Sequence, residues 1–381
     1  MTKTEPAQRR LREQVLDTGL CTGCGACVGN CPYFEHYRDA AVVLHACDLE
    51  QGRCHAHCPR TPTDLESLRG ALFDLRDLTP ELGALRGLYL TRASDPAVRA
   101  RAQHGGTVSA LTALALKEGW IDGLVQTRGQ EDQQTAGTLV TDPADLAGGT
   151  GTRFVASPAV AAFNRACRGD AQRIGVVATP CQALAYAKLR TNPAPEAQAQ
   201  AGKLALVIGL FCGWALSWRE FSHLLGHRVG RARVLSTDIP PSRYQRMEVR
   251  TDQGTVEIPL AEVLPCVRPN CAACFDLTCE FADLSVGSAR SEQGWEVDRG
   301  WNQVITRTEQ GERLLDLARE KGCLEFREVP AGNLEKLKAA AVNKKRACIR
   351  RLEELSGAPG DWLYLSPDDP VLGELGHWDV K

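Results

Sequence analysis

The sequence of 381 residues lacks an excess of either charge, a long apolar run and a G-x-G-x-x-G fingerprint. Its 45 basic residues nearly balance 47 acidic residues, so the composition gives no reason to expect nucleic-acid binding. No stretch reaches the roughly 20 apolar residues that a membrane-spanning helix needs, and the charged N-terminal stretch has no apolar signal core. Without the glycine fingerprint, no motif supports a nicotinamide cofactor.

Cysteine, by contrast, is abundant, with 16 residues. Many of these cysteines stand in spacings that are typical of metal sites, and the sequence shows no secretory segment. We therefore expect metal ligation in a reducing, cytoplasmic compartment and not a framework of disulfides.

The run from Cys21 to Pro32 has the C-x2-C-x2-C-x3-C-P spacing of bacterial ferredoxins. Gly23 and Gly25 allow the tight loop that thiolates around one cuboidal cluster require. In two-cluster ferredoxins the fourth Cys of such a run binds the other cluster, and a second Cys-Pro pair follows at Cys58. We assign one 4Fe-4S cluster to Cys21, Cys24, Cys27 and Cys58. Zinc or disulfides are the alternatives that this specific spacing disfavours.

The second half of the ferredoxin pattern is incomplete. An unbroken repeat would place Cys near positions 48, 51, 54 and 58, but the chain has Asp48 and Gln51. A second cluster therefore has three thiolates available, from Cys31, Cys47 and Cys54. Its fourth ligand stays open among Asp48, His45, His55, His57 and a Cys from elsewhere. A degenerate half without metal is the alternative.

Apolar runs and turn residues predict a three-part chain. Residues 1–80 form an N-terminal arm and a ferredoxin-like module that ends in a helix at 63–78. Residues 81–330 form a mixed α/β domain, and residues 331–381 form a helical and irregular tail. The elements expected in the middle part are strands at 88–92, 121–127, 173–179 and 204–212, helices at 107–120, 159–167 and 310–321, a loop at 143–154, a linker at 192–202 and a hairpin at 246–260.

Two glycines, Gly105 and Gly106, precede the Ala/Leu-rich helix. A glycine turn that feeds a helix N-terminus favours a phosphate, because free N–H groups and the helix dipole point at it. This signal is weak alone, since many helices begin in this way. The Gly/Thr-rich loop at 143–154 suits the close approach of a cofactor, and its composition fits an ordinary surface loop equally well.

A second set of cysteines follows the strands of the middle part. Cys181 and Cys212 stand at the ends of two apolar strands, which in an α/β sheet point ligands into a shared crevice. Cys271 and Cys274 form a C-x2-C pair that brings both sulfurs to one metal site. We expect these four to bind a further 4Fe-4S cluster. Cys266 and Cys279 are competing ligands, and buried unliganded thiols are the alternative.

Several motifs in this order resemble one known family. They are QHGGTVSALTALALKEGWIDGLV, ATPCQ, GLFC, C-x2-CFD, ADLSVGS, GW and ITRTEQGERLL. They are similar to the beta subunits of coenzyme F420-reducing hydrogenase and of F420-linked formate dehydrogenase, a group that includes plant hydroxymethyl chlorophyll a reductase. The resemblance covers roughly residues 15–325.

The resemblance implies a mixed α/β, FAD-binding domain behind the ferredoxin-like module, with a flavin beside a 4Fe-4S cluster. It places at the flavin Gly105, Gly106, Thr107, Ser109, Gly151, Thr152 and Arg153. It places Thr179, Pro180 and Cys181 between flavin and cluster, and it gives the flavin-proximal cluster the ligands Cys181, Cys212, Cys271 and Cys274. With the ferredoxin-like module, two or three 4Fe-4S clusters are expected.

We therefore expect an oxidoreductase subunit that splits a two-electron hydride into single electrons, because a flavin accepts hydride and clusters carry single electrons. The donor or acceptor is a small molecule such as coenzyme F420, and the partners are other redox subunits or a ferredoxin. A stand-alone ferredoxin-dependent reductase of an organic substrate and a non-catalytic scaffold are the alternatives. His104 is the candidate proton donor, with flavin packing or solvation as its competing role.

Overall fold

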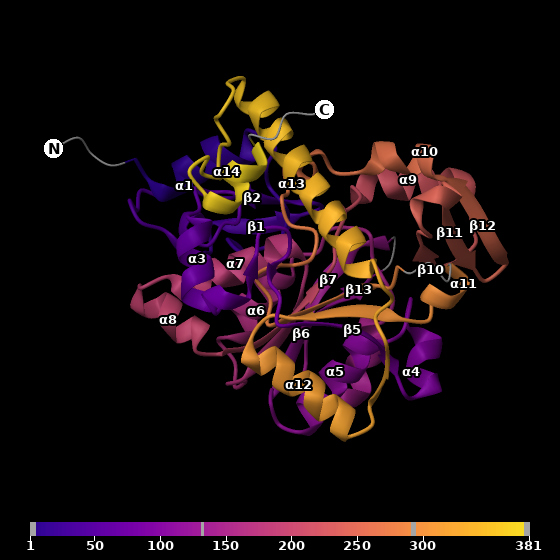
Figure 1. Cartoon of the computed structure of the whole chain (residues 1–381). Helices are drawn as coiled ribbons and strands as arrows, with labels where there is room; N and C mark the ends of the chain where they lie inside the picture. The colour runs from indigo at the N-terminus through magenta and orange to yellow at the C-terminus, as the bar shows by residue number, and fades with distance from the viewer. Residues whose placement is uncertain (1–4, 131–132, 291–294, 377–381) are drawn as a thin grey trace.

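The computed structural model describes residues 5–130, 133–290 and 295–376, and a mixed β-sheet lies at its centre (Figure 1). Within these residues the sheet has eight strands. Their spatial order is β15 (Leu324–Arg327), β5 (Gly87–Ala93), β14 (Asn302–Thr306), β13 (Leu284–Ser288), β9 (Leu204–Leu210), β8 (Ile174–Ala178), β6 (Gly123–Gly129) and β7 (Thr135–Val140). Strands β13, β9, β8 and β6 pair in parallel, and the other pairings in this sheet are antiparallel.

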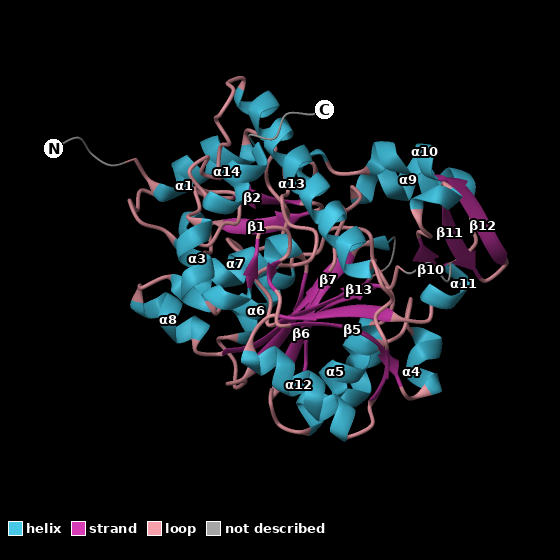
Figure 2. Ribbon diagram, in the orientation of Figure 1, coloured by secondary structure: helices cyan, strands magenta, loops and turns pink. Residues whose placement is uncertain are grey.

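Helices cover both faces of this sheet (Figure 2). Helices α5 (Thr107–Lys117) and α12 (Glu309–Glu320) pack on one face, and α6 (Ala159–Ala166) and α7 (Pro180–Thr191) pack on the other. Burial on both faces explains why β8 and β9 are continuous apolar runs and not alternating ones. The predicted strands and the predicted helices of this domain are confirmed to within a few residues.

The N-terminal module packs against α6 and α7. Its elements are α1 (Ala7–Leu11), a π-helical turn (Arg12–Leu16), β1 (Phe34–Tyr37), β2 (Ala40–Val43), α2 (Arg53–Ala56) and α3 (Leu65–Leu72). Gly25 has a φ of 84°, and a Cβ there would lie 2.9 Å from the Ala161 backbone nitrogen. Asn164 of α6 donates from Nδ2 to the Val28 carbonyl at 2.7 Å. The cysteine-rich loop is therefore fitted closely to α6.

A small lobe projects from the sheet, at the right in Figure 1. It consists of β10 (Val234–Asp238), β11 (Arg246–Thr251), β12 (Gly254–Pro259), α9 (Trp218–Arg228) and α10 (Leu260–Val263), which share one apolar core. The pairing of Thr251 with Gly254 closes β11 and β12 into a hairpin, as predicted.

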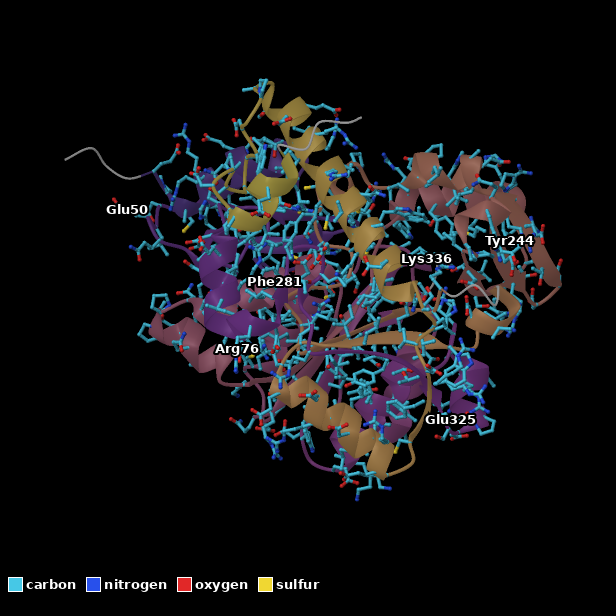
Figure 3. All side chains as sticks on the ribbon, viewed as in Figure 1. Glu50, Arg76, Tyr244, Phe281, Glu325 and Lys336 are labelled. Atoms are coloured by element: carbon cyan, nitrogen blue, oxygen red, sulfur yellow. The ribbon has the colours of Figure 1, made fainter. Side chains whose placement is uncertain are left out.

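The C-terminal segment returns to the N-terminal module. Helix α13 (Asn333–Ser356) is 24 residues long, and the chain beyond it reaches α14 (Pro370–Gly376) beside the module (Figure 1). Arg69 of α3 forms an ion pair with Asp369 at 2.7 Å, and both side chains are buried. The Thr63 N–H donates to the Tyr364 carbonyl at 3.0 Å. Phe281, labelled in Figure 3, is buried and packs against Phe73 of the same module.

Some expected elements differ from the structure. The expected linker at 192–202 contains a helix, α8 (Pro195–Ala201), and the helix expected at 63–78 ends at Leu72. The loop expected at 143–154 begins with a 3-10 helix (Pro143–Gly149). The remaining α-helices and strands of the described residues are α4 (Pro96–Arg101), α11 (Trp295–Asp298), β3 (Leu78–Thr79) and β4 (Gly83–Ala84). Further 3-10 helices span Leu75–Asp77, Ser242–Tyr244, Leu264–Cys266 and Pro269–Cys271.

The divisions at about residues 80 and 330 stay a prediction. The first four residues of the expected arm and Gly294 of the GW motif lie outside the described residues. None of the helices within the described ranges combines the length and the apolar character that crossing a lipid bilayer requires.

Candidate functional site

A cavity of about 490 Å³ lies at the carboxyl ends of the central strands. Ala178 of β8 pairs with Gly209 of β9 in a parallel ladder, so the chain leaves both strands at the same edge of the sheet. Ligands of open α/β sheets bind in the crevice at this edge. The cavity lining combines the start of α5, the loop at 149–157, the segments after β8 and β9, the end of β13, the loop at 268–274 and one residue of α13.

The start of α5 contributes Gly106, Thr107 and Ser109 to the lining. Gly106 caps the helix with a φ of 78°, a left-handed conformation that glycine adopts without strain. Gly105 does not line the cavity. A Cβ at Gly105 would lie 2.8 Å from Asn302 Oδ1, so this glycine lets the turn pack against β14.

The second predicted loop and the start of α7 face the same cavity. Gly151, Thr152, Arg153, Thr179 and Pro180 all belong to its lining. The N–H of Thr179 donates to Gln182 Oε1 at 2.9 Å, and the two side chains form a capping box that fixes the first turn of α7.

Several polar groups of the cavity were not predicted. The Ser157 hydroxyl is buried in the lining and makes no hydrogen bond within the described residues. The lining also holds cationic side chains, those of the predicted Arg153 and of the unpredicted Arg60, Arg268, Arg290 and Lys344. Among the described lining residues there is no Asp or Glu. The cavity is therefore electropositive and suits an anionic ligand such as a dinucleotide phosphate or a thiolate-bound cluster.

Cys181, Cys212, Cys271 and Cys274 all line this cavity. The Ala215 N–H donates to Cys271 Sγ at 3.3 Å, and Thr179 Oγ1 lies 3.4 Å from Cys181 Sγ. Burial is the main cause that raises the pKa of the Cys212 thiol, and the three other thiols raise it further. The structure thus brings together four thiols from three distant segments, which spacing alone did not establish.

The two competing cysteines lie elsewhere. Cys266 is buried in the core of the small lobe, and its Sγ lies 3.9 Å from the Glu262 carbonyl oxygen. Cys279 is fully buried outside the cavity lining, and its Sγ lies 3.5 Å from the Ala178 carbonyl oxygen. Neither thiol is among the lining residues, so the geometry favours the predicted set of four.

The first ferredoxin set lies beside the cavity. Burial raises the pKa of Cys27, and the neighbouring thiols Cys21, Cys24 and Cys58 raise it further. Cys24 also lines the cavity and lies close enough to Cys181 for that thiol to contribute to its raised pKa. The two thiol sets therefore approach each other across the cavity wall.

Arg60 lies between these two sets. Its backbone N–H donates to Cys58 Sγ at 3.4 Å, and its buried guanidinium donates to the Ala273 carbonyl, inside the C-x2-C loop. The same guanidinium also donates to the hydroxyl of Tyr364, which comes from the C-terminal segment. A single side chain thus connects both sets with the returning chain end.

The donor type fits iron–sulfur clusters. Among the described residues, no three His, Cys, Asp or Glu side chains converge on the position of a single metal ion. In a cuboidal cluster each thiolate binds a different iron, so the sulfur atoms stay further apart than around one zinc ion. Four half-buried thiols beside cationic groups match the wider spacing of a cuboidal cluster.

His104 also lines the cavity, and its pKa is lowered chiefly by burial. Cys31, Cys47 and Cys54 lie outside the cavity lining, and the thiols of Cys31 and Cys47 are neighbours of Cys54. Lys344 and Ser157 escaped prediction because no local motif contains them, whereas Arg60 directly follows the Cys58-Pro59 pair. Arg268 stands three residues before the C-x2-C pair, so the positions of Arg60 and Arg268 were the available signals.

Comparison with known families agrees with these motifs. Two models described as the N-terminal and C-terminal parts of the coenzyme F420 hydrogenase/dehydrogenase beta subunit match residues 88–164 and 171–331. A model described as a 4Fe-4S binding domain matches residues 15–33.

Individual relatives agree as well. The beta subunit of coenzyme F420 hydrogenase from Methanothermobacter thermautotrophicus is 29% identical over 283 residues, which cover 72% of this chain and 97% of that protein. The subunit of the same name from Methanococcus voltae is 30% identical over 62% of this chain and 82% of that protein.

A solved structure extends the similarity to the fold. One chain of the xenon-derivatized F420-reducing [NiFe] hydrogenase complex from Methanosarcina barkeri superimposes with a TM-score of 0.66 at 26% identity. The alignment covers 72% of this chain and 94% of that chain. The chain therefore belongs to the family of coenzyme F420 hydrogenase/dehydrogenase beta subunits, oxidoreductase subunits that here carry an N-terminal 4Fe-4S motif.

Proposed function

We propose that this chain is an electron-transfer subunit that binds FAD in the cavity and exchanges a hydride with a deazaflavin such as coenzyme F420. The observation that carries the proposal is the shared lining of one cavity. The glycine turn of α5 and the loop at 151–153 lie on its walls together with Cys181, Cys212, Cys271 and Cys274. A flavin in this place would lie beside a cluster.

The residues present fit these groups. Gly106, Thr107 and Ser109 would hold an FAD phosphate at the start of α5, where free N–H groups and the dipole favour an anion. Arg153 would add a positive charge, and the Ser157 hydroxyl would gain the hydrogen-bond partner that it lacks within the described chain. When bound, FAD supplies two-electron hydride chemistry, and the clusters supply single-electron transfer.

The protein's own part in this function is positioning and insulation. Thr179 and Pro180 would separate the flavin from the proximal cluster at a fixed distance, because the capping box holds the first turn of α7. Arg60 and Arg268 tie the ferredoxin loop to the C-x2-C loop. Arg268 donates to the Thr22 carbonyl at 2.5 Å and to the Cys21 carbonyl at 2.9 Å. Electrons would leave through the Cys21, Cys24, Cys27 and Cys58 cluster to another redox subunit.

The test uses the full chain purified without oxygen, with flavin and iron counted first. Reduced coenzyme F420, NADH and reduced ferredoxin are then added separately, and the visible absorbance of flavin and clusters is followed. We expect bound FAD and rapid bleaching by reduced F420. A preparation without flavin, or bleaching by reduced ferredoxin alone, would contradict the proposal.

A pair of arginine variants tests the flavin position. Arg153→Gln removes a cation from the cavity lining, so we expect weaker retention of FAD on gel filtration with the iron content kept. Arg128→Gln is the matched control, because Arg128 is exposed and lies outside the lining. Equal FAD retention in both variants would place the flavin elsewhere.

A further inference from the structure

The loop between β2 and α2 is held in place by a buried amide. Gln8 of α1 donates from Nε2 to the His45 carbonyl at 2.8 Å, and its Oε1 accepts from the Cys47 N–H at 2.9 Å. The Ala7 N–H donates to the Leu49 carbonyl at 2.8 Å. Gln8 is 7% exposed, and a buried amide is tolerated because both of its ends are paired. Cys47 therefore has a fixed position although it stands in a loop.

Cys31 and Cys54 lie close to this fixed thiol. Arg53 donates from Nη2 to the Asn30 carbonyl at 3.2 Å, which ties the residue before Cys54 to the residue before Cys31. The thiols of Cys31 and Cys47 both lie near enough to Cys54 to interact with it electrostatically. Gly52 keeps space beside Cys54, because a Cβ at Gly52 would lie 3.2 Å from Cys54 Sγ and 3.1 Å from the Ala7 side chain. Three thiols from separate segments of the module therefore lie near one another. If the second half of the ferredoxin pattern bound no metal, nothing would require these three thiols to lie together.

The histidines that were candidates for the fourth ligand have other contacts. His55 Nε2 lies 3.0 Å from Gln14 Oε1, and His57 Nε2 lies 3.0 Å from Asn192 Nδ2. The ring of His45 packs edge-on against Tyr33, with the centroids 6.0 Å apart.

The remaining positions face solvent. Asp48 and Gln51 are exposed, and Gln51 stands where a complete ferredoxin repeat has its ligand. Leu49 is 62% exposed, and Figure 3 shows the neighbouring Glu50 at the outer edge of the molecule. The side of the three-thiol site that lacks a ligand is therefore the side that water reaches.

We propose that Cys31, Cys47 and Cys54 bind a second cuboidal iron–sulfur cluster through three thiolates, and that its fourth iron, next to Gln51, has solvent in place of a protein ligand. This inference rests on the proposed ferredoxin-like role of the N-terminal module. It differs from a two-cluster ferredoxin, in which every iron has a cysteine ligand.

An iron without a protein ligand is the one that leaves on oxidation. With such a cluster bound, ferricyanide would take one electron from the doubly positive four-iron core, one ferrous ion would depart, and a singly positive three-iron core would remain on the thiolates of Cys31, Cys47 and Cys54. The electron reduces ferricyanide to ferrocyanide, so charge and iron balance. Clusters with four thiolate ligands hold all their irons more firmly under the same treatment.

The experiment treats the anaerobically purified chain with a small excess of ferricyanide. Released ferrous ion is measured with a chromogenic chelator, and the three-iron cluster is measured by its electron paramagnetic resonance signal. We expect about one released iron per chain together with that signal. Suppose that the iron content accounts for a cluster at this site, but neither released iron nor the three-iron signal is observed. A protein group would then be the ligand of the fourth iron, and the proposal would be overturned.

Matched variants assign the signal to this site. Gln51→Cys supplies the missing thiolate and is expected to suppress iron release and the three-iron signal, whereas Gln51→Ala is expected to behave as the unmodified chain. Cys54→Ser is expected to lose the signal and the iron of one cluster, and Cys323→Ser, a thiol of the central domain, is the control. An undiminished signal in Gln51→Cys or in Cys54→Ser would place the labile iron elsewhere and refute the inference.

The result is separable from that of the proposed function. Flavin content and bleaching by reduced F420 are measured on the same samples. A missing flavin with an intact three-iron signal would refute the proposed function alone. Normal bleaching in a chain whose iron content is unchanged by Cys54→Ser would refute this inference alone.

Discussion

The charge of Arg60 is expected to raise the reduction potentials of the two clusters proposed beside it. Its guanidinium is buried, its backbone binds Cys58 Sγ, and its side chain binds the loop of Cys271 and Cys274. Reduction adds negative charge to a cluster, so a fixed cation nearby stabilises the reduced form. At an effective dielectric constant of about 20 and a separation of about 8 Å, one unit charge contributes about 2 kcal/mol, which corresponds to roughly 90 mV for one electron.

The perturbation is Arg60→Met, which removes the charge and approximates the length of the side chain. We expect the midpoint potentials of the two clusters to fall by tens of millivolts, with about 90 mV as the upper range. The assay is a redox titration followed by electron paramagnetic resonance, with iron and flavin counted in each sample. Arg60→Lys keeps the charge and should shift the potentials much less.

Tyr364→Phe distinguishes the effect of the Arg60 charge from the effect of its hydrogen bonds, because it removes one hydrogen-bond partner of Arg60 and leaves the cation. It should lower stability by roughly 1 kcal/mol without a comparable change in potential. If Arg60→Met retains both clusters and leaves their potentials unchanged, the electrostatic reasoning fails.

Three further predictions concern ligands and packing. Cys274→Ser should lose the iron of the flavin-proximal cluster while Cys266→Ser keeps it, and iron analysis with flavin counted in parallel decides between them. Asn164→Ala removes the amide that binds the ferredoxin loop and should speed iron loss to a chelator, whereas the exposed Arg165→Ala should not; equal rates would contradict this. Asp369→Ala leaves a buried arginine without its partner and should cost about 3–5 kcal/mol in denaturant unfolding, so a loss below 1 kcal/mol would refute the importance of that ion pair.

Local patterns predicted the parts of the fold that local physics determines. The strands around Val176 and Val207 could be predicted from the sequence, because strands buried on both faces are continuous apolar runs. Helix α8 was missed because its buried side is made of Ala197 and Gln200, so its composition shows no apolar face. Gln200 is buried because it donates to Asn30 Oδ1 at 2.7 Å, a contact between residues 170 positions apart.

The residues of the candidate site also fall into those that local motifs predict and those that only the folded chain brings together. Glycine turns and C-x2-C spacing identify groups that lie near each other in sequence, and the structure brings these predicted groups to one cavity. Arg60 and Lys344 join that site from segments far apart in the chain. Lys344 donates to the Cys212 carbonyl at 2.5 Å across 132 positions. No spacing rule encodes such a contact, because it depends on where α13 crosses the finished sheet.

The return of the C-terminal segment to the N-terminal module has a consequence for biosynthesis. The ribosome releases the cysteine-rich loop early, but Tyr364, which binds Arg60, is made 304 residues later. Tyr364 and Asp369, the buried partners of Arg60 and Arg69, are therefore not yet synthesised when the N-terminal module leaves the ribosome. Iron delivered during translation would meet an open, exchangeable loop, whereas iron delivered after release would meet a closed one. We therefore expect iron inserted at this loop before release to exchange more readily than iron inserted after the C-terminal segment has docked.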